Sequence, residues 1–392
     1  MHYDEFYQRM LETNHKIPQF RISVSSKNGE QDITQQVSQR LMQLTLIDNR
    51  GFEADELDLQ LSDHDGSLML PSRGAKIDVA MGWKGQQLIP KGSYIVDEIQ
   101  YSGTPDSLTI RAKSADMRGT LHSKKERSFH QTTFGKLIDQ IAQENGLEPL
   151  CHKAFKDKPI SHLDQTNEST INLLSRLAEE NDAIATVKNG KLLFMPAGKG
   201  KTATDKPLPP IHITRQSGDS FNFSLVESDN YTAVRAYWHN LDTGKKGEVV
   251  FDKNSKIERK TRLTKGRKRK DGTVTGQRQS KRKYNQLVQT EPVETDANQM
   301  KTLRYTYKTE AAALNAAKAA FEKIQRGVAT FSLNLALGNP ELMPELPVTV
   351  QGFKSMIDSS EWIITKVTHS IGDSGFTSSV ELELRVNETE NS

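Results

Sequence analysis

Cysteine is almost absent from this chain of 392 residues, because Cys151 is its single cysteine. One thiol cannot form an intramolecular disulfide, so we expect synthesis in a reducing compartment, the cytoplasm. Aromatic residues make up 7% and hydrophobic residues 35% of the chain. No run of about 18 apolar residues occurs, so no membrane anchor is expected. The N-terminal residues also lack the basic and apolar regions of a secretory signal.

The common motifs of catalytic and metal sites are missing as well. The sequence contains neither the H-E-x-x-H helix of zinc enzymes nor the G-x-S-x-G turn of hydrolases. Residues 198–202 end like a phosphate-binding loop, but Met195 stands where that loop requires glycine. Cys151 and His152 are sequence neighbours, which is not the spatial arrangement of an activated thiol. Residues 63–66 are better interpreted as a polar turn than as metal ligands. We therefore predict no catalytic residue, no metal and no cofactor.

Charge is distributed unevenly along the chain. The net charge is +3, yet residues 253–283 hold 14 Lys and Arg against Glu258 and Asp271. This stretch has few apolar residues, so we expect a mobile, solvated loop. Contact of its basic residues with a polyanion or an acidic protein partner is the alternative. Aromatic residues are sparse within it, so stacking on single-stranded nucleic acid is not expected. The candidate contact residues are Lys265, Arg267, Lys268, Arg269, Lys270, Lys281, Arg282 and Lys283.

Two stretches near opposite ends of the chain read as the same β-module. The first has alternating runs at residues 57–61, 76–80, 93–99 and 107–110, and the second at residues 333–337, 347–350, 361–367 and 379–384. Each third run opens on an aromatic residue. Alternation predicts barrel core anchors at Tyr94, Ile95, Ile99, Trp362, Ile364 and Val367. Chance similarity between half-buried strands is the alternative explanation.

The middle of the chain has a different pattern. Thr132 or Thr133 is a candidate N-cap for an amphipathic helix that ends near Gly146. A second helix follows residue 169, and Asn189-Gly190 predicts a hairpin turn between two strands. The predicted fold is therefore mainly β with an α+β insert: two similar small β-barrel (tube-like) domains plus a smaller α+β domain.

The expected domain boundaries follow from these patterns. They are 1–121 for an N-terminal arm and first β-barrel, 122–196 for the α+β insert domain, 197–210 for a linker, 211–388 for a second β-barrel with the long basic loop 253–283, and 389–392 for a disordered tail. An alanine-rich helix over residues 309–325, capped by Thr309, is expected inside the last domain.

The most specific string in the chain runs QTNESTINLLSRLAEENDA over residues 165–183. It resembles the Q-x-x-E-S/T-x-x-x-L/F-L-x-R-L-A helix of the phage late control gene D protein family. These are tail hub proteins of contractile-tailed phages, similar in turn to the hub part of valine-glycine repeat protein G. The stretches 57–80 and 92–115 look like the first barrel of that family, and 332–383 looks like its second. The matching motif residues are Gln165, Glu168, Ser169, Leu174, Arg176 and Leu177.

The resemblance implies a structural baseplate hub of a contractile tail or injection machine, without catalysis of its own. Three chains with two barrels each would form a homotrimer that presents six similar modules to the tail tube protein and a three-fold axis to the central spike protein. Other baseplate proteins would be partners too, and DNA or an effector would pass through the lumen. The resemblance also implies synthesis in the host bacterial cytoplasm and incorporation in the tail baseplate.

Two other functions remain as alternatives at this point. A hub-associated peptidoglycan-degrading enzyme would need a carboxylate or metal site within residues 122–196. A nucleic-acid-contacting protein would act through the basic stretch 253–283, which is longer and more basic than the resemblance requires.

Overall fold

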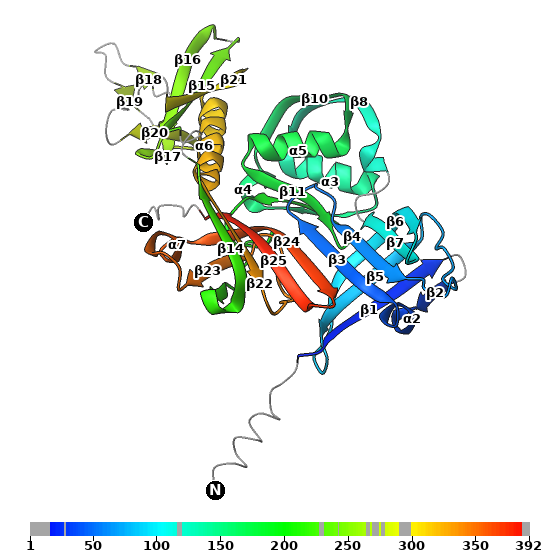
Figure 1. The fold of residues 1–392 in the computed structure, drawn as a ribbon. Helices are drawn as coiled ribbons and strands as arrows, with labels where there is room; N and C mark the ends of the chain where they lie inside the picture. Colours follow the sequence, from blue (N-terminus) through cyan, green and yellow to red (C-terminus); the bar gives the residue numbers. More distant parts are fainter. Residues whose placement is uncertain are drawn as a thin grey trace. The chain divides into compact units, whose positions relative to one another are not determined.

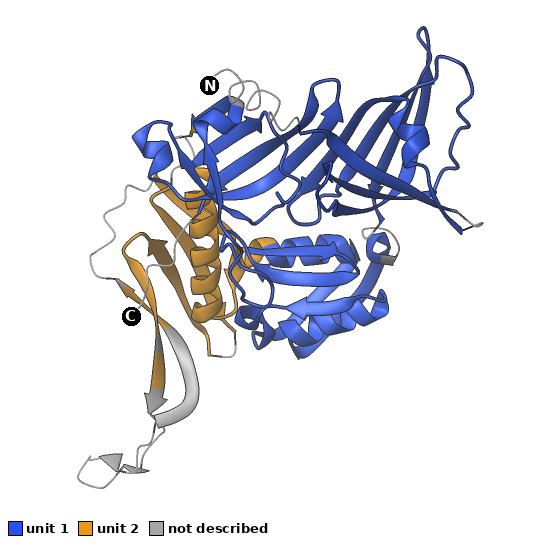
Figure 2. Ribbon diagram, turned by 90° about the horizontal axis from the view of Figure 1, so that it is seen from below, with its two compact units in different colours: residues 1–178, 183–224, 329–392 blue, residues 179–182, 225–328 orange. Residues whose placement is uncertain are grey.

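The computed structural model describes two compact units of the chain. The described residues are 16–26, 29–115, 120–226, 231–241, 243–263, 267–268, 274–275, 279–289 and 299–385. One unit comprises residues 1–178, 183–224 and 329–392, and the other comprises residues 179–182 and 225–328 (Figure 2). The predicted N-terminal arm and the predicted tail at 389–392 lie outside the described residues.

One sheet of 13 strands organises the first unit, so the prediction of a mainly β chain is confirmed. Its main path is β14-β22-β25-β24-β3-β4-β7-β6-β5-β1-β2, and β23 pairs with both β24 and β13 (Figure 1). The strands are β1 Pro18–Ser26, β2 Gly29–Asp32, β3 Leu41–Asn49, β4 Glu56–Ser62, β5 Lys76–Trp83, β6 Ile89–Ser102, β7 Ser107–Ser114, β13 Ile211–Thr214, β14 Gly218–Leu225, β22 Ala329–Leu335, β23 Pro347–Gln351, β24 Trp362–Gly372 and β25 Gly375–Leu384. Two short helices, α2 (Thr34–Ser38) and α7 (Ser355–Asp358), lie between strands.

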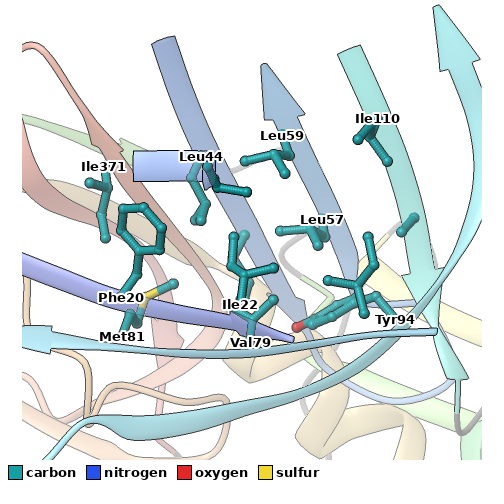
Figure 3. Packing of buried hydrophobic residues seen from close by; sticks show 14 of the residues in the cluster. Phe20, Ile22, Leu44, Leu57, Leu59, Val79, Met81, Tyr94, Ile110 and Ile371 are labelled. Atoms are coloured by element: carbon teal, nitrogen blue, oxygen red, sulfur yellow. The ribbon is translucent and has the colours of Figure 1, made fainter. Parts of the chain in front are cut away.

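The strands β1 to β7 form an N-terminal module around one apolar core. Alternate residues of β4 (Leu57, Leu59 and Leu61) are buried, as a strand with one face on the core requires. They meet buried side chains from β1, β3, β5 and β6, among them Tyr94 (Figure 3). Ile371 from β24 joins the same cluster, so a strand of the C-terminal module helps to fill this core.

The two predicted β-modules have the same strand neighbours. The order β4-β7-β6-β5 in the N-terminal module matches β22-β25-β24-β23 in the C-terminal module. Tyr94 pairs with residues of β5 and β7, and Trp362 pairs in the same way with β23 and β25. Both third strands also carry a register shift at the same place, after Val96 and after Ile364. A shared order and a shared bulge favour duplication over chance similarity.

The first runs of the two modules, 57–61 and 333–337, do not begin at corresponding residues. Leu57 pairs with Ala112, and Phe331 pairs with Leu382, the residue that corresponds to Ala112. Leu57 therefore corresponds to Phe331. Alternation alone cannot set this offset, because a shift of two residues keeps the parity of a strand.

An α+β part follows the N-terminal module and has its own apolar cluster. Its elements are β8 Lys124–Thr133, α3 Phe134–Glu144, β9 Glu148–Cys151, α4 Lys153–Lys156, β10 Pro159–Ser169, α5 Thr170–Glu180, β11 Ala183–Lys188 and β12 Lys191–Pro196. Thr133 caps α3 as predicted, because its hydroxyl accepts a hydrogen bond from the Lys136 amide. The hairpin predicted at Asn189-Gly190 joins β11 and β12, and both turn residues have positive φ.

The second unit contains a three-stranded sheet and a long helix. Strands β15 (Ala233–Asn240), β16 (Lys245–Asp252) and β21 (Met300–Tyr307) form the sheet. Helix α6 (Glu310–Gly327) packs on it through small alanines, Leu314 and Phe321. The Thr309 hydroxyl accepts a hydrogen bond from the Ala312 amide at 3.2 Å, so the predicted N-cap is confirmed.

The expectation of a loop over residues 253–283 was wrong for much of that stretch. Strands β17 (Ser255–Leu263) and β20 (Gln279–Gln289) pair antiparallel, and β18 (Arg267–Lys268) pairs with β19 (Val274–Thr275). Hydrogen bonds between two adjacent strands do not require a buried face, and Ile257 and Leu287 still pack on the apolar cluster of this unit. Composition therefore underestimated the order of this segment.

Candidate assembly surfaces

The two aromatic anchors occupy corresponding buried places. The Tyr94 hydroxyl donates to the carbonyl of Lys91 at 2.8 Å, and the Trp362 indole N–H donates to the carbonyl of Ile357 at 3.1 Å. Each donor is satisfied by a carbonyl three to five residues before the ring, so each buried aromatic has a local hydrogen-bond partner.

The remaining predicted anchors divide between core and surface. Ile364 and Val367 are fully buried, and Ile99 packs partly against the N-terminal core. The prediction for Ile95 was wrong, because alternation places it on the face opposite to Tyr94, where it is only half-buried. Val96 occupies the core position instead. Strict alternation counted from Tyr94 would have identified it.

The residues of the family motif lock the end of β10 to the start of α5. Gln165 is fully buried, and its amide donates to the Glu168 carbonyl at 2.9 Å. The Glu168 carboxylate accepts two hydrogen bonds from Arg176, and the Ser169 hydroxyl accepts from the Asn172 amide at 3.1 Å. Leu174 and Leu177 are buried in the cluster below. These contacts position α5 against the end of β10. The contacts of these side chains among the described residues therefore serve the fold.

The predicted basic contact residues lie partly outside the described residues. Lys265, Arg269 and Lys270 lie outside the described residues. Arg267 and Lys268 are the two residues of strand β18. The other three, Lys281, Arg282 and Lys283, belong to β20.

A junction between the two β-modules is made by backbone pairing. Residues 366–372 of β24 pair antiparallel with residues 43–49 of β3. The Trp83 indole N–H donates to the Gly338 carbonyl at 3.0 Å, and the Lys91 ammonium donates to the Leu342 carbonyl at 3.1 Å. The loop of residues 336–346 therefore packs on strands of the N-terminal module.

Gly338 allows this loop to approach closely. A Cβ at this position would lie 2.5 Å from the Phe376 ring, and no side-chain shift of a packed aromatic absorbs such an overlap cheaply. The Phe376 ring in turn lies 5.2 Å from Trp83. Sequence reasoning missed this glycine, since its requirement comes from a neighbour far along the chain.

Charged groups from several segments gather beside the junction, around a cavity of about 430 Å³. The Lys188 ammonium on β11 lies 2.9 Å from the Asp48 carboxylate and also contacts Asp55. Burial opposes the charge of Lys188, but the two carboxylates outweigh burial and raise its pKa. Arg50 pairs with Glu345 and with Glu383, which ties β3 to the C-terminal module. The Arg50 pairs reinforce the β24–β3 ladder, and the Lys188 pairs join the α+β part to the N-terminal module.

A buried histidine makes the junction sensitive to acid. His369 is fully buried on β24, where its Nδ1 lies 2.8 Å from the Ser378 hydroxyl. Burial, and to a smaller extent the Lys91 charge, lower the pKa of His369 to about 3 from 6.5. An unfolded chain therefore binds a proton here near pH 6.5, while the folded chain stays neutral until much lower pH. The stabilisation is present above pH 6.5 and is lost progressively as the pH falls towards 3.

We expect this histidine to contribute about 2–4 kcal/mol to the loss of stability on acidification. The measurement is the free energy of the unfolding transition that exposes β24, from denaturant titrations between about pH 7 and pH 4.5, on the wild type and on His369→Gln. The glutamine variant should be less stable at neutral pH but should lose less on acidification. Parallel pH curves for the two proteins would contradict the prediction.

The face of the large sheet that points away from the cores is polar. Arg111 on this face is paired with Asp58 at 3.2 Å and with Glu98 at 2.9 Å, and Gln43 donates to the Ser370 hydroxyl at 3.3 Å across the junction. Hydroxyl, amide and charged side chains thus continue from one module to the other. Representative residues are Gln43, Thr45, Asp58, Gln60, Thr109, Arg111, Thr368, Ser370, Ser379 and Glu381.

The described residues contain no group of three His, Cys, Asp or Glu side chains arranged to hold a metal ion. Burial raises the pKa of the Cys151 thiol to about 11, so the thiol stays protonated near neutral pH. In the same described residues, no helix has the length and apolar character needed to cross a membrane.

The chain is similar to known proteins over most of its length. The family model described as "Phage tail baseplate hub (GPD)" matches residues 56–375. A protein of Escherichia phage 186 named "Probable baseplate hub protein" is 43% identical over 374 residues, which cover 95% of this chain and 94% of that protein. The protein of the same name from Escherichia phage P2 is 44% identical over 375 residues and covers 95% of each chain.

Solved structures support the fold. The tail protein from Neisseria meningitidis MC58 has a TM-score of 0.61 at 12% identity, covering 93% of this chain and 96% of that one. The 43 kDa tail protein of prophage MuSo2 from Shewanella oneidensis has a TM-score of 0.58 at 12% identity, covering 92% of this chain and 98% of that one. At such identities the likeness concerns the fold alone.

Proposed function

We propose that this chain, which belongs to the phage tail baseplate hub family, assembles as a homotrimeric ring between the tail tube and the three-fold spike. The family match and the two baseplate hub relatives establish its role as a baseplate hub component of the phage tail. The proposal adds the number of copies, their arrangement and their partners.

The observation that carries the proposal is the shared strand order of the two β-modules. A chain that contains one module twice can present two similar surfaces, and three such chains present six around a three-fold axis. We propose that each module acts as a small barrel-like wall segment, the first within residues 1–121 and the second within residues 211–388, where residues 225–328 belong to the separate compact unit. The β24–β3 pairing, with residues 366–372 opposite 43–49, supports this because it sets the two segments edge to edge in one chain.

The polar face is the surface that we assign to the central channel. Its charges are largely paired within the face, as for Arg111 with Asp58 and Glu98, and hydroxyl and amide groups fill the space between them. Such a surface offers few apolar or unpaired basic groups on which passing DNA or an effector would be retained. Tail tube protein, central spike protein and other baseplate proteins are the partners that this arrangement requires.

The hub would act without catalysis and without a cofactor. The relatives named above are baseplate hub proteins, and burial keeps the Cys151 thiol protonated, which disfavours a thiol nucleophile. Synthesis in the host bacterial cytoplasm, before incorporation in the baseplate, is part of the same proposal.

Light scattering coupled to size-exclusion chromatography tests the ring directly. The full chain, alone at high concentration and co-expressed with its spike protein, should elute with three chains of 44.0 kDa each. Association through large interfaces should make the trimer persist on dilution. Monomeric hub chains in both preparations would overturn the proposal.

A further inference from the structure

We propose that strand β6 of one copy pairs antiparallel with strand β14 of a second copy, residues 99–102 opposite residues 222–225. This inference rests on the proposed ring and specifies the contact that closes it. The partner is a second copy of this chain, because the chain already contains the template of the contact in its own β24–β3 pairing.

The first step is the correspondence between β24 and β6. Each strand contains a buried aromatic, Tyr94 within β6 and Trp362 at the start of β24, and each has a register shift that begins two residues later. His369, seven residues after Trp362, therefore corresponds to Tyr101, seven residues after Tyr94. Within the chain, His369 pairs with Leu46 of β3.

The second step is the correspondence between β3 and β14. Strand β3 borders β4, and β14 borders β22, which is the counterpart of β4. The Val226 amide donates to the Val328 carbonyl, and the Asn334 side chain donates to Ser220 at 2.7 Å. Both contacts fit one antiparallel register, in which Phe223 lies opposite Phe331. Phe331 corresponds to Leu57, the residue that pairs with Leu46. Phe223 is therefore the counterpart of Leu46.

The register between copies follows from these two correspondences. Tyr101 should lie opposite Phe223, as His369 lies opposite Leu46. One residue further along, Ser102 should lie opposite Asn222 on the polar face, as Ser370 lies opposite Thr45 within the chain.

Exposed apolar side chains mark both strands at the proposed contact. At the internal junction His369 and Leu46 are both 0% exposed. Of their counterparts, Tyr101 is 52% exposed, and Phe223 is half-buried against the C-terminal core. Phe221 and Leu225, the neighbours of Phe223 on the same face of β14, are 46% and 49% exposed. Among the described residues, β14 pairs only with β22, and residues 98–102 of β6 pair only with β7. Unpaired, apolar edges of this kind are ready to accept another strand.

A second pair of exposed surfaces fits the same arrangement. At the internal junction the β22–β23 loop packs on the N-terminal module near Trp83. The corresponding β4–β5 loop carries Met69 and Leu70 at its tip, 90% and 61% exposed. Its expected contact on the second copy is the segment before Trp362, where Met356 of α7 is 56% exposed. Apolar contact between these residues would extend the interface beyond the strand edges.

Disulfide cross-linking tests the register. In a Cys151→Ser background, the pair Ser102→Cys and Asn222→Cys should give covalently linked trimers on mild oxidation of the assembled hub. The matched internal pair, Thr45→Cys and Ser370→Cys, should close within one chain and gives the efficiency of a known contact. A pair shifted by two residues, Ser102→Cys with Ser220→Cys, should give about tenfold less linked trimer, since disulfides tolerate little change in Cβ separation.

The outcomes separate this inference from the proposed ring. One outcome is a trimer by light scattering in which the internal pair closes but the 102–222 pair gives no linkage. This outcome would overturn the strand pairing but would not contradict the ring. Equal linkage from the shifted pair would also overturn the register. Monomers in every preparation would overturn ring and pairing together.

A surface substitution provides a second readout that does not depend on disulfide geometry. Tyr101→Lys places a charge at the proposed apolar contact and should abolish the trimer while the monomer keeps its circular dichroism and thermal midpoint. Leu337→Lys is the control, because Leu337 is 55% exposed and lies outside the proposed contact. Trimers of unchanged stability with Tyr101→Lys would contradict the inference.

Discussion

Replacing Trp362 with alanine should lower the free energy of unfolding of the C-terminal β-module by about 3–5 kcal/mol. The indole is fully buried among Phe223, Phe331 and other side chains of β13 and β22–β25, with the Phe331 ring centroid at 5.4 Å. Removing it leaves a cavity at the place where β23, β24 and β25 meet. The carbonyl of Ile357 also loses its hydrogen-bond donor.

Hydrogen exchange read by mass spectrometry is the suitable measurement, because a chain with several compact parts need not unfold in one step. Peptides from β22 to β25 should exchange faster in the variant, by a factor that corresponds to the lost stability. Trp362→Phe keeps most of the volume and should cost about 1–2 kcal/mol. If protection in β22–β25 is the same in Trp362→Ala as in the wild type, the anchor role assigned to this residue is wrong.

The second large effect is expected from the buried ion pair of the other compact unit. The guanidinium of Arg326 at the end of α6 binds both carboxylate oxygens of Asp182, one of them at 2.7 Å, and both side chains are buried. Arg326→Met should destabilise this unit by about 3–5 kcal/mol, because the Asp182 charge would remain buried without its partner.

A matched pair on the same two segments provides the control. Lys323 of α6 and Glu179 form an ion pair at 2.7 Å, but both side chains are mostly exposed. Lys323→Met should therefore change stability by less than about 1 kcal/mol. Exchange of α6 amides measures both variants, and equal effects of the two substitutions would show that burial does not govern the Arg326 contact.

Much of the fold could be predicted from local pattern. Alternation located the strands of both β-modules, and hydroxyl residues before apolar helical stripes located α3 and α6 through Thr133 and Thr309. The family motif was identified from consecutive residues, since Gln165 and Glu168 act on segments only a few residues away.

The parts that could not be predicted depend on residues far apart in the chain. Gly338 is required because Phe376 lies against it, and nothing near Gly338 in the sequence indicates that contact. The β24–β3 junction also could not be predicted from local sequence, because the pattern of a strand specifies which face is buried but not which strands pair with it. Ile95 was misassigned for a different reason. Hydrophobicity alone does not distinguish a core residue from an apolar residue that is half-buried on the other face of the strand.

The junction between β24 and β3 also determines how the hub would respond to pulling. Seven consecutive residue pairs connect the strands, and the charged contacts of Arg50 lie at one end of that ladder. Tension applied along the strands strains all seven pairs together, whereas tension applied across them opens the pairs one at a time, like a zip. In a tail that drives its tip through a cell envelope, the hub would therefore resist the load best if the force acts along the β24 and β3 strands.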